Sequence, residues 1–179
     1  MKNKRNIMII AVFALLMLQT AIFAQAVTQD ANVAAVVREP LVLSVFDAVD
    51  FGNVQTGSTP VLDPVTGNGT DVGTVHSIAY FTLTGSDGAA LSIAYDATVT
   101  LGDGVDQTMT FTPNLVGHED TQSSATTIAN ASNTTVIGAT GYTFWLGGTL
   151  GTLTGQATGT YSSSASNGSG DFTLTIEYY

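Results

Sequence analysis

The 179-residue sequence contains no cysteine. Disulfide bonds, thiolate metal ligands and cysteine nucleophiles are therefore excluded. A lipid-modified cysteine is excluded for the same reason. The fold must be stabilised by its own hydrophobic core, and a chain of about 150 residues is long enough to bury one.

Basic residues are almost as scarce. The sequence has 4 Lys+Arg against 14 Asp+Glu, a formal net charge of −10. Lys2, Lys4 and Arg5 stand in the first five positions, and Arg38 is the only other basic residue. Nucleic-acid binding needs clustered Lys and Arg, so we expect no nucleic-acid partner. Lysine-based chemistry and attraction to an anionic membrane surface are excluded for residues 27–179.

The first 26 residues have the three parts of a secretory signal peptide. Charged residues 1–5 precede an unbroken apolar run, residues 7–18, and Ala24-Gln25-Ala26 supplies a cleavage site. The run is shorter than the ~20 residues of a membrane span, and no second run follows. We expect residues 1–26 to be removed and no span to remain. We also expect export to the periplasm, the cell surface or the extracellular medium.

Apolar and polar residues alternate along many short segments of the remaining chain, separated by turns rich in Gly, Asp, Asn and Ser. This pattern is typical of half-buried antiparallel strands. It predicts an all-β fold over residues 40–179, an antiparallel β-sandwich of the Greek-key, jelly-roll or pilin-like kind, in one domain. The small, polar residues 122–135 are interpreted as a long loop. The terminal strand is predicted to point four side chains inward: Phe172, Leu174, Ile176 and Tyr178.

Residues 27–39 stand apart from this pattern. They are small and polar, with weak alternation at Val33, Ala35 and Val37. Pro40 then interrupts the chain before the first firm strand. Three interpretations stay open for this segment: a disordered terminus, a first strand, or a detachable assembly arm.

Residues able to support catalysis or metal binding are few, and we expect no enzymatic activity. The adjacent His118, Glu119 and Asp120 would point to opposite sides of a strand and so would not converge on one ion. Residues 67–71 resemble a single calcium turn of β-helix repeats, and Asp103 with Asp106 offers another oxygen pair. We expect no cofactor, although weak calcium binding is compatible with the acidic sequence.

Aromatic residues offer a possible sugar-binding surface. Tyr142, Trp145, Tyr178 and Tyr179 are the candidates. Packing in the core explains Tyr142 and Tyr178 equally well. Glycans are therefore one candidate class of partner.

Short motifs follow one another along the chain in a characteristic order. They are Pro40-Leu41-Val42-Leu43, residues 49–54 (VDFGNV), 63–67 (DPVTG), 80–88 (YFTLTGSDG), 107–111 (QTMTF) and 146–150 (LGGTL), then Gly159-Thr160-Tyr161 and the terminal strand. In this order the chain resembles a family of exported bacterial proteins catalogued as domain of unknown function 4402. The resemblance implies secretion, an all-β fold and surface exposure, and it brings no catalytic residues.

The two ends of residues 27–179 also resemble fimbrial subunits of the chaperone–usher kind. Those subunits end in an alternating strand with a penultimate Tyr, as Tyr178 is here, and carry a short apolar N-terminal arm. This sequence lacks their cysteine pair. An incomplete sandwich has an open edge that can accept another chain's strand. We therefore expect a fimbria-like structural subunit that self-associates or joins other surface subunits. The alternative is a monomeric adhesin or carbohydrate-binding module.

Overall fold

A computed structural model describes residues 34–179. The chain divides into two units, Met1–Val36 and Val37–Tyr179, and the fold described below is that of the second. The predicted signal peptide, residues 1–26, and residues 27–33 lie outside the described part. Within that part, no helix is long and apolar enough to cross a membrane.

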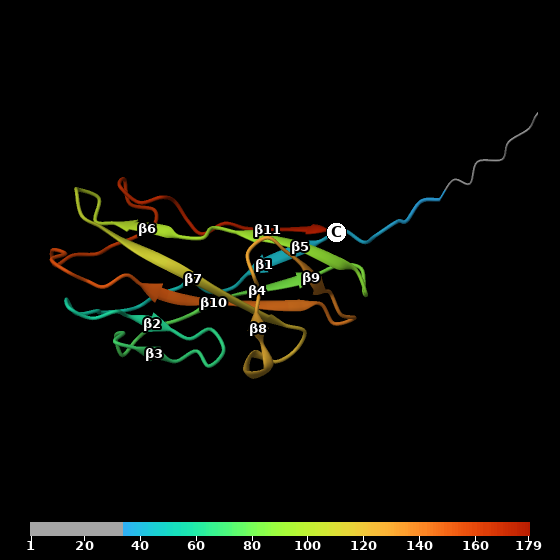
Figure 1. The fold of residues 1–179 in the computed structure, drawn as a ribbon, viewed down its shortest axis with the longest axis horizontal. Helices are drawn as coiled ribbons and strands as arrows, with labels where there is room; N and C mark the ends of the chain where they lie inside the picture. The colour runs from blue at the N-terminus through green and yellow to red at the C-terminus, as the bar shows by residue number, and fades with distance from the viewer. Residues whose placement is uncertain (1–33) are drawn as a thin grey trace, which may run out of the picture. The chain divides into compact units, whose positions relative to one another are not determined.

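The second unit is all-β, and its strands form two antiparallel sheets arranged as a sandwich, as predicted (Figure 1). The larger, eight-stranded sheet has the order β1-β4-β10-β2-β3, with β7 pairing β10, β6 and β8. The smaller sheet has the order β11-β5-β9. The strands are β1 (Val42–Val45), β2 (Val61–Leu62), β3 (Gly69–Thr70), β4 (Ala79–Thr84), β5 (Ala90–Tyr95), β6 (Val99–Gly102), β7 (Thr108–His118), β8 (Thr126–Thr127), β9 (Ser132–Val136), β10 (Tyr142–Leu150) and β11 (Leu174–Tyr178).

Strand β10 organises the larger sheet. One of its edges pairs with β7 from Thr143 to Leu150. Its other edge pairs first with β4 and then, at Gly148 and Thr149, with β2. A Cβ added at Gly147 would lie 2.4 Å from the Leu62 carbonyl oxygen, and one at Gly148 would lie 2.2 Å from that of Thr112. The backbones therefore approach more closely than any side chain at these two positions would allow.

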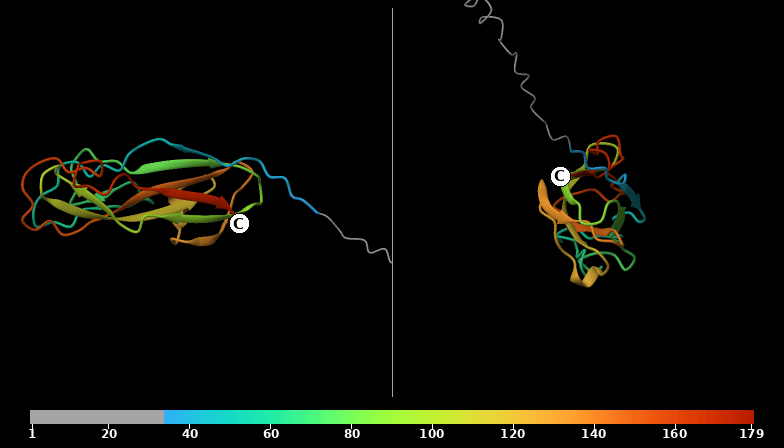
Figure 2. Two further views of the ribbon diagram at one scale, coloured as in Figure 1. Left: turned by 90° about the horizontal axis from the view of Figure 1, so that it is seen from above. Right: turned by 90° about the vertical axis from the view of Figure 1, so that its right-hand side faces the viewer.

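The core lies between the two sheets (Figure 2). Alternate residues of β4 are buried, and in the smaller sheet Leu91 and Ile93 of β5 are fully buried, as is Phe144 of β10. Burying a side chain of this size contributes about 1.5–3 kcal/mol each. The period-two alternation read from the sequence therefore marks the buried faces of these central strands correctly.

The prediction of one long loop over residues 122–135 was wrong. This stretch contains a 3-10 helix η1 (Gln122–Ser124), then β8 and most of β9. Strand β9 pairs with β5 although its residues are mostly Ser, Asn and Thr. Backbone pairing holds it in place, Thr135 is buried within it, and the fully buried Ile137 follows directly. β-branched Thr suits an edge strand, so no apolar alternation was needed.

Candidate functional site

Strand β1 is an edge strand with apolar side chains and one open edge. Among the described residues it pairs only with β4, in the register Val42↔Thr84 to Val45↔Phe81. The Phe46 N–H donates to the Tyr80 carbonyl at 3.1 Å, which continues this register. Because antiparallel pairs alternate between bonded and non-bonded positions, the backbone groups of Leu43 and Val45 point away from β4. They are free to pair with a further strand.

The core-facing side chains of β1 are only partly covered. Leu43 lies opposite Leu83 and Val45 opposite Phe81, and both β4 partners are buried at 1% and 7% exposure. Side chains of directly opposed residues share a face, so Leu43 and Val45 point toward the core. Their exposed fractions are nevertheless 36% and 64%. The sandwich therefore lacks a covering element along this edge.

Strand β11 forms the matching edge of the smaller sheet. Its residues alternate between half-buried and exposed, as the sequence predicted, with Phe172, Leu174, Ile176 and Tyr178 on the half-buried side. Hydrogen bonds from Tyr179 to Ala90 and from Asp96 to Thr173 fix its pairing with β5. By the same alternation, the backbone groups of Leu174, Ile176 and Tyr178 face an open edge.

Contacts at both ends bring the edges of β1 and β11 near each other, and we call the region between these two edges the seam. At one end the chain just before β1 meets the end of β11, because the Tyr178 hydroxyl contacts Glu39. At the other end Phe172, just before β11, packs 6.4 Å from Phe81, the residue opposite Val45. The seam therefore has two apolar walls, Leu43 and Val45 on one side and Leu174 and Ile176 on the other. Neither wall is fully buried.

A cluster of contacts around Tyr178 closes one end of the seam, and we call it the clasp. The Tyr178 hydroxyl donates to the Glu39 carbonyl at 2.6 Å and accepts from the Ser86 N–H at 2.7 Å. The Glu39 N–H donates to the Ser86 hydroxyl at 2.6 Å. The Arg38 guanidinium lies 5.1 Å from the centre of the Tyr178 ring, within cation–π range. The clasp fixes the chain where residues 27–39 join the sandwich.

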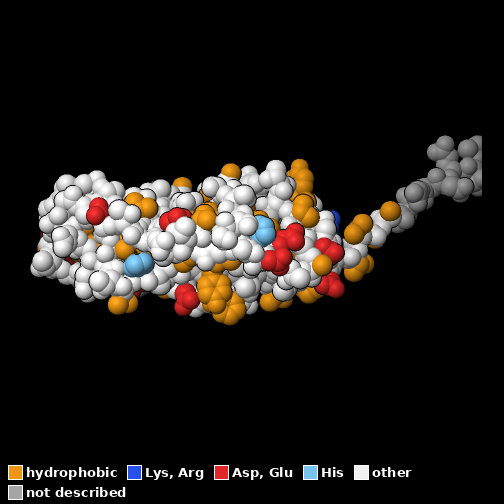
Figure 3. Space-filling view, turned by 90° about the horizontal axis from the view of Figure 1, so that it is seen from below, with side chains coloured by type: hydrophobic (Ala, Val, Ile, Leu, Met, Phe, Trp, Pro, Cys, Tyr) orange, Lys and Arg blue, Asp and Glu red, His pale blue; other side chains and the backbone are white. Residues whose placement is uncertain are grey.

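The predicted arm residues are exposed where the structure describes them. Val33 lies outside the described residues, Ala35 is exposed, and Val37 is 94% exposed. Residues 34–39 belong to no strand. Six of the ten exposed large hydrophobic side chains in the described part fall between residues 36 and 46. Figure 3 shows apolar side chains interrupting an otherwise polar surface, with acidic side chains grouped toward one end.

The candidate ion ligands do not gather into one group in the described residues. No group of three or more His, Asp and Glu side chains is placed to hold a metal there. Asp103 instead organises a turn, because its Oδ1 accepts N–H bonds from Val105, Asp106 and Gln107 at 2.8, 3.1 and 3.1 Å. These bonds, with Val105 the largest contributor, hold the pKa of the Asp103 carboxyl below its usual value.

The predicted sugar-binding aromatics are scattered rather than grouped. Tyr142 packs on Phe144 with ring centres 5.0 Å apart, and burial raises the pKa of its phenol, with Glu119 adding to the effect. Trp145 is 9% exposed, whereas Tyr179 is 73% exposed. Sequence reasoning missed Phe46, which is 55% exposed. It stacks on Tyr80 across strands, with ring centres 4.8 Å apart.

The comparison with protein families returned one match. A family model described as "Domain of unknown function (DUF4402)" matches residues 48–178. The resemblance drawn from the order of the motifs is thereby confirmed. No curated protein and no solved structure matches the chain. The likeness to fimbrial subunits stays a prediction.

Proposed function

The chain belongs to the DUF4402 family, and we propose that it is an exported, non-enzymatic structural subunit of a cell-surface filament or fimbria-like layer, which assembles by donating a strand into the seam of another copy. The observation that carries the proposal is the exposure of Leu43 and Val45 on the core-facing side of β1. An added strand would cover them and pair with the open backbone edges.

Covering the seam gives enough energy to matter. Complete burial of an exposed Val or Leu side chain contributes about 1.5–3 kcal/mol, so the partly exposed Leu43 and Val45 would add about 1–2 kcal/mol each. The half-buried Leu174 and Ile176 would add smaller amounts. Backbone hydrogen bonds to both edges would contribute about 0.5–1.5 kcal/mol apiece. Together these terms can offset the cost of association, which is at least about 4 kcal/mol.

The arm of a second copy is the occupant that fits best. Residues 33–37 equal the five-residue β11 in length and alternate Val33, Ala35 and Val37 on one face. To fill its own seam, the arm would have to reverse direction within residues 38–40. Glu39 is held there through its N–H and its carbonyl group, and Pro40 disfavours helical turn conformations at Glu39. Donation to another copy avoids this reversal and leads to a head-to-tail filament.

The proposal is tested by size-exclusion chromatography and negative-stain electron microscopy of the purified protein. The wild type is expected to form filaments. The double variant Leu43→Asp/Val45→Asp is expected to stay monomeric, because its charges cannot be buried in a filled seam. The matched control Val105→Asp adds a charge at a site that is 80% exposed and distant in sequence from both edges, so it should still assemble.

Trypsin gives a second readout, because Arg38 is the only trypsin site after residue 5. Cleavage after Arg38 should be rapid in the monomeric double variant and slow in wild-type filaments. Monodisperse wild-type particles at all concentrations would contradict the proposal, as would filaments of the double variant. Equal cleavage of monomer and filament would count against the arm as the donated strand.

The alternative function is a monomeric surface or periplasmic adhesin or carbohydrate-binding module. The observation that favours it is a separate pocket formed by loops, which does not involve the seam. If the wild type stays monomeric, this function becomes the better proposal. A pocket and a strand-accepting edge are also compatible in one protein.

A further inference from the structure

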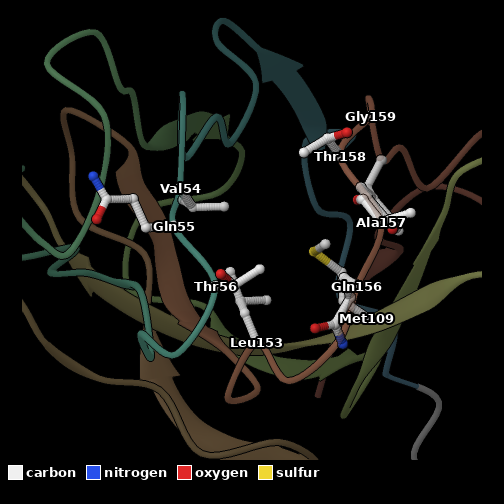
Figure 4. A pocket seen from close by; sticks show the side chains of 10 residues that line it. Val54, Gln55, Thr56, Met109, Leu153, Gln156, Ala157, Thr158 and Gly159 are labelled. Carbon is white, nitrogen blue, oxygen red and sulfur yellow. Dashed lines mark hydrogen bonds between the residues drawn. The ribbon is translucent and has the colours of Figure 1, made fainter.

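A cavity of about 480 Å³ lies between two loops at the start of β7. One wall is the segment Val54–Thr56, between β1 and β2. The other wall is the segment Gln156–Gly159, between β10 and β11, and the two walls face each other across the cavity with Met109 and Leu153 between them (Figure 4). A volume of this size matches ordinary small-molecule pockets.

Hydrogen bonds between the loops hold this cavity in shape. The Gly57 N–H donates to the Leu153 carbonyl at 2.6 Å, and the Leu153 N–H donates to the Ser58 carbonyl at 3.0 Å. The hydroxyls of Thr59 and Thr152 lie 3.0 Å apart. These contacts tie the two loops together beside the cavity. A preformed pocket loses less entropy on binding than one that must order its loops.

The chemistry of the lining favours a neutral, hydroxyl-rich ligand. Val54, Met109 and Leu153 supply apolar surface, whereas Thr56 and Thr158 supply hydroxyls. None of the lining side chains is charged, although the described part of the chain carries 13 acidic residues. Sugars combine apolar C–H faces with neutral hydroxyls and match both parts of this surface.

The surrounding charge disfavours an anionic ligand. Tyr161 also lines the cavity, and its hydroxyl donates to the Ala157 carbonyl at 3.0 Å. Burial raises the pKa of the Tyr161 phenol, and the negative charges of Asp103 and Asp106 raise it further. The charges of these two carboxylates therefore make the electrostatic potential at this wall more negative. A carboxylated or sulfated sugar would be repelled.

Gln156 adds a second observation at this cavity. Its Oε1 is the only buried side-chain oxygen or nitrogen in the described residues that lacks a hydrogen-bond partner. Such atoms are uncommon, because burying an unpaired acceptor is unfavourable. Gln156 also lines the cavity, and its last side-chain torsion is soft, so the carboxamide can rotate to pair with a bound molecule. A ligand hydroxyl would donate the missing hydrogen bond.

We propose that this cavity is a binding site for a neutral saccharide, in which Gln156 and Thr158 hydrogen-bond the sugar hydroxyls and Met109 and Leu153 contact its C–H surface. The site uses no residue of the seam. It therefore stands whether or not the protein assembles by strand donation.

The test is a binding screen on the purified protein. An array of neutral oligosaccharides of glucose, galactose, mannose and N-acetylglucosamine is compared with sialylated and sulfated counterparts, and ligand-observed NMR then measures affinity for the methyl glycosides. We expect saturable binding of neutral sugars. Gln156→Met and Thr158→Val should each weaken it about three- to tenfold, the worth of one hydrogen bond.

Thr160→Val is the matched control, because Thr160 is an exposed threonine of the same loop that does not line the cavity. It should leave affinity unchanged. Gln156→Met should also raise the thermal unfolding midpoint of the free protein, because it removes the unpaired acceptor. The proposal is overturned if no neutral sugar binds, if anionic sugars bind better, or if Thr160→Val weakens binding as much as Thr158→Val.

Discussion

The hydroxyl of Tyr178 is the centre of the clasp, and removing it tests how residues 38–41 are attached to the sandwich. In Tyr178→Phe the aromatic ring stays, so packing and the contact with Arg38 are retained. Two hydrogen bonds are lost, one from the Ser86 N–H at 2.7 Å and one to the Glu39 carbonyl at 2.6 Å. The bond from the Ser86 N–H is partly buried, so without the Tyr178 hydroxyl this N–H is left unpaired and poorly solvated.

The expected destabilisation follows from these two bonds. A neutral hydrogen bond contributes about 0.5–1.5 kcal/mol, and an unsatisfied buried donor costs more. We expect Tyr178→Phe to lower the free energy of unfolding by about 1–2 kcal/mol. For a domain of this size that corresponds to a fall of roughly 2–8 °C in the unfolding midpoint.

Urea denaturation followed by circular dichroism measures the change in the free energy of unfolding. Limited trypsin digestion measures how far the segment around Arg38 is loosened. Loss of the Glu39 contact should free the backbone around Arg38. In the monomeric Leu43→Asp/Val45→Asp background, where no assembly protects the arm, adding Tyr178→Phe should therefore make cleavage there several-fold faster. The control is Tyr179→Phe. That residue is 73% exposed, and its substitution should change stability by less than about 0.5 kcal/mol.

Two results would refute this reasoning. If Tyr178→Phe and Tyr179→Phe unfold at the same urea concentration, the clasp does not contribute to stability. If Tyr178→Phe is destabilised but does not speed cleavage after Arg38 in the monomeric background, the hydroxyl acts on the β4–β5 turn through Ser86 alone. Attachment of the segment before β1 would then not depend on it.

Three further predictions concern the core, the clasp and a turn. Phe144→Ala should cost about 3–5 kcal/mol in urea unfolding, because Phe144 is fully buried. Gly85→Ala should cost about 1–3 kcal/mol in the same assay, because its Cβ would lie 2.6 Å from the Tyr178 hydroxyl. The pKa of the Asp103 carboxyl is lower in the folded state, so its hydrogen bonds stabilise the fold at pH values above the ordinary carboxyl pKa of about 3.9. This stabilisation is lost as the pH falls through the lower pKa of the folded state. The protection factor of the Val105 amide, which corrects for the pH dependence of intrinsic exchange, should therefore fall only below about pH 4.

The sequence predicted the strands in which apolar residues alternate with polar ones and the apolar residues are the more buried. In β4, Ala79, Phe81 and Leu83 are buried, and β11 alternates along its whole length. Strand β9 could not be predicted in this way, because it is held by backbone pairing to β5 and its side chains are polar. A polar edge strand leaves no hydrophobic period in the sequence.

The candidate site shows a different limit of sequence reasoning. Leu43 and Val45 alternate with polar or outward-facing positions in the sequence, but alternation cannot tell whether anything covers the face they share. Their exposure depends on where the smaller sheet ends, which is a tertiary property. The cavity between the loops left no pattern either, because the loops around Thr56 and Gln156 come together only through contacts made after folding.

The negative charge of this protein limits the forces that can hold two copies together. The described residues carry 13 acidic side chains and one basic side chain, Arg38, so two copies repel each other at long range. A single arginine cannot supply a complementary charged interface. Attraction between copies therefore has to come from apolar burial and backbone hydrogen bonds, which act only at contact. The seam offers both, because β1 and β11 each present apolar side chains and backbone groups that no described strand pairs.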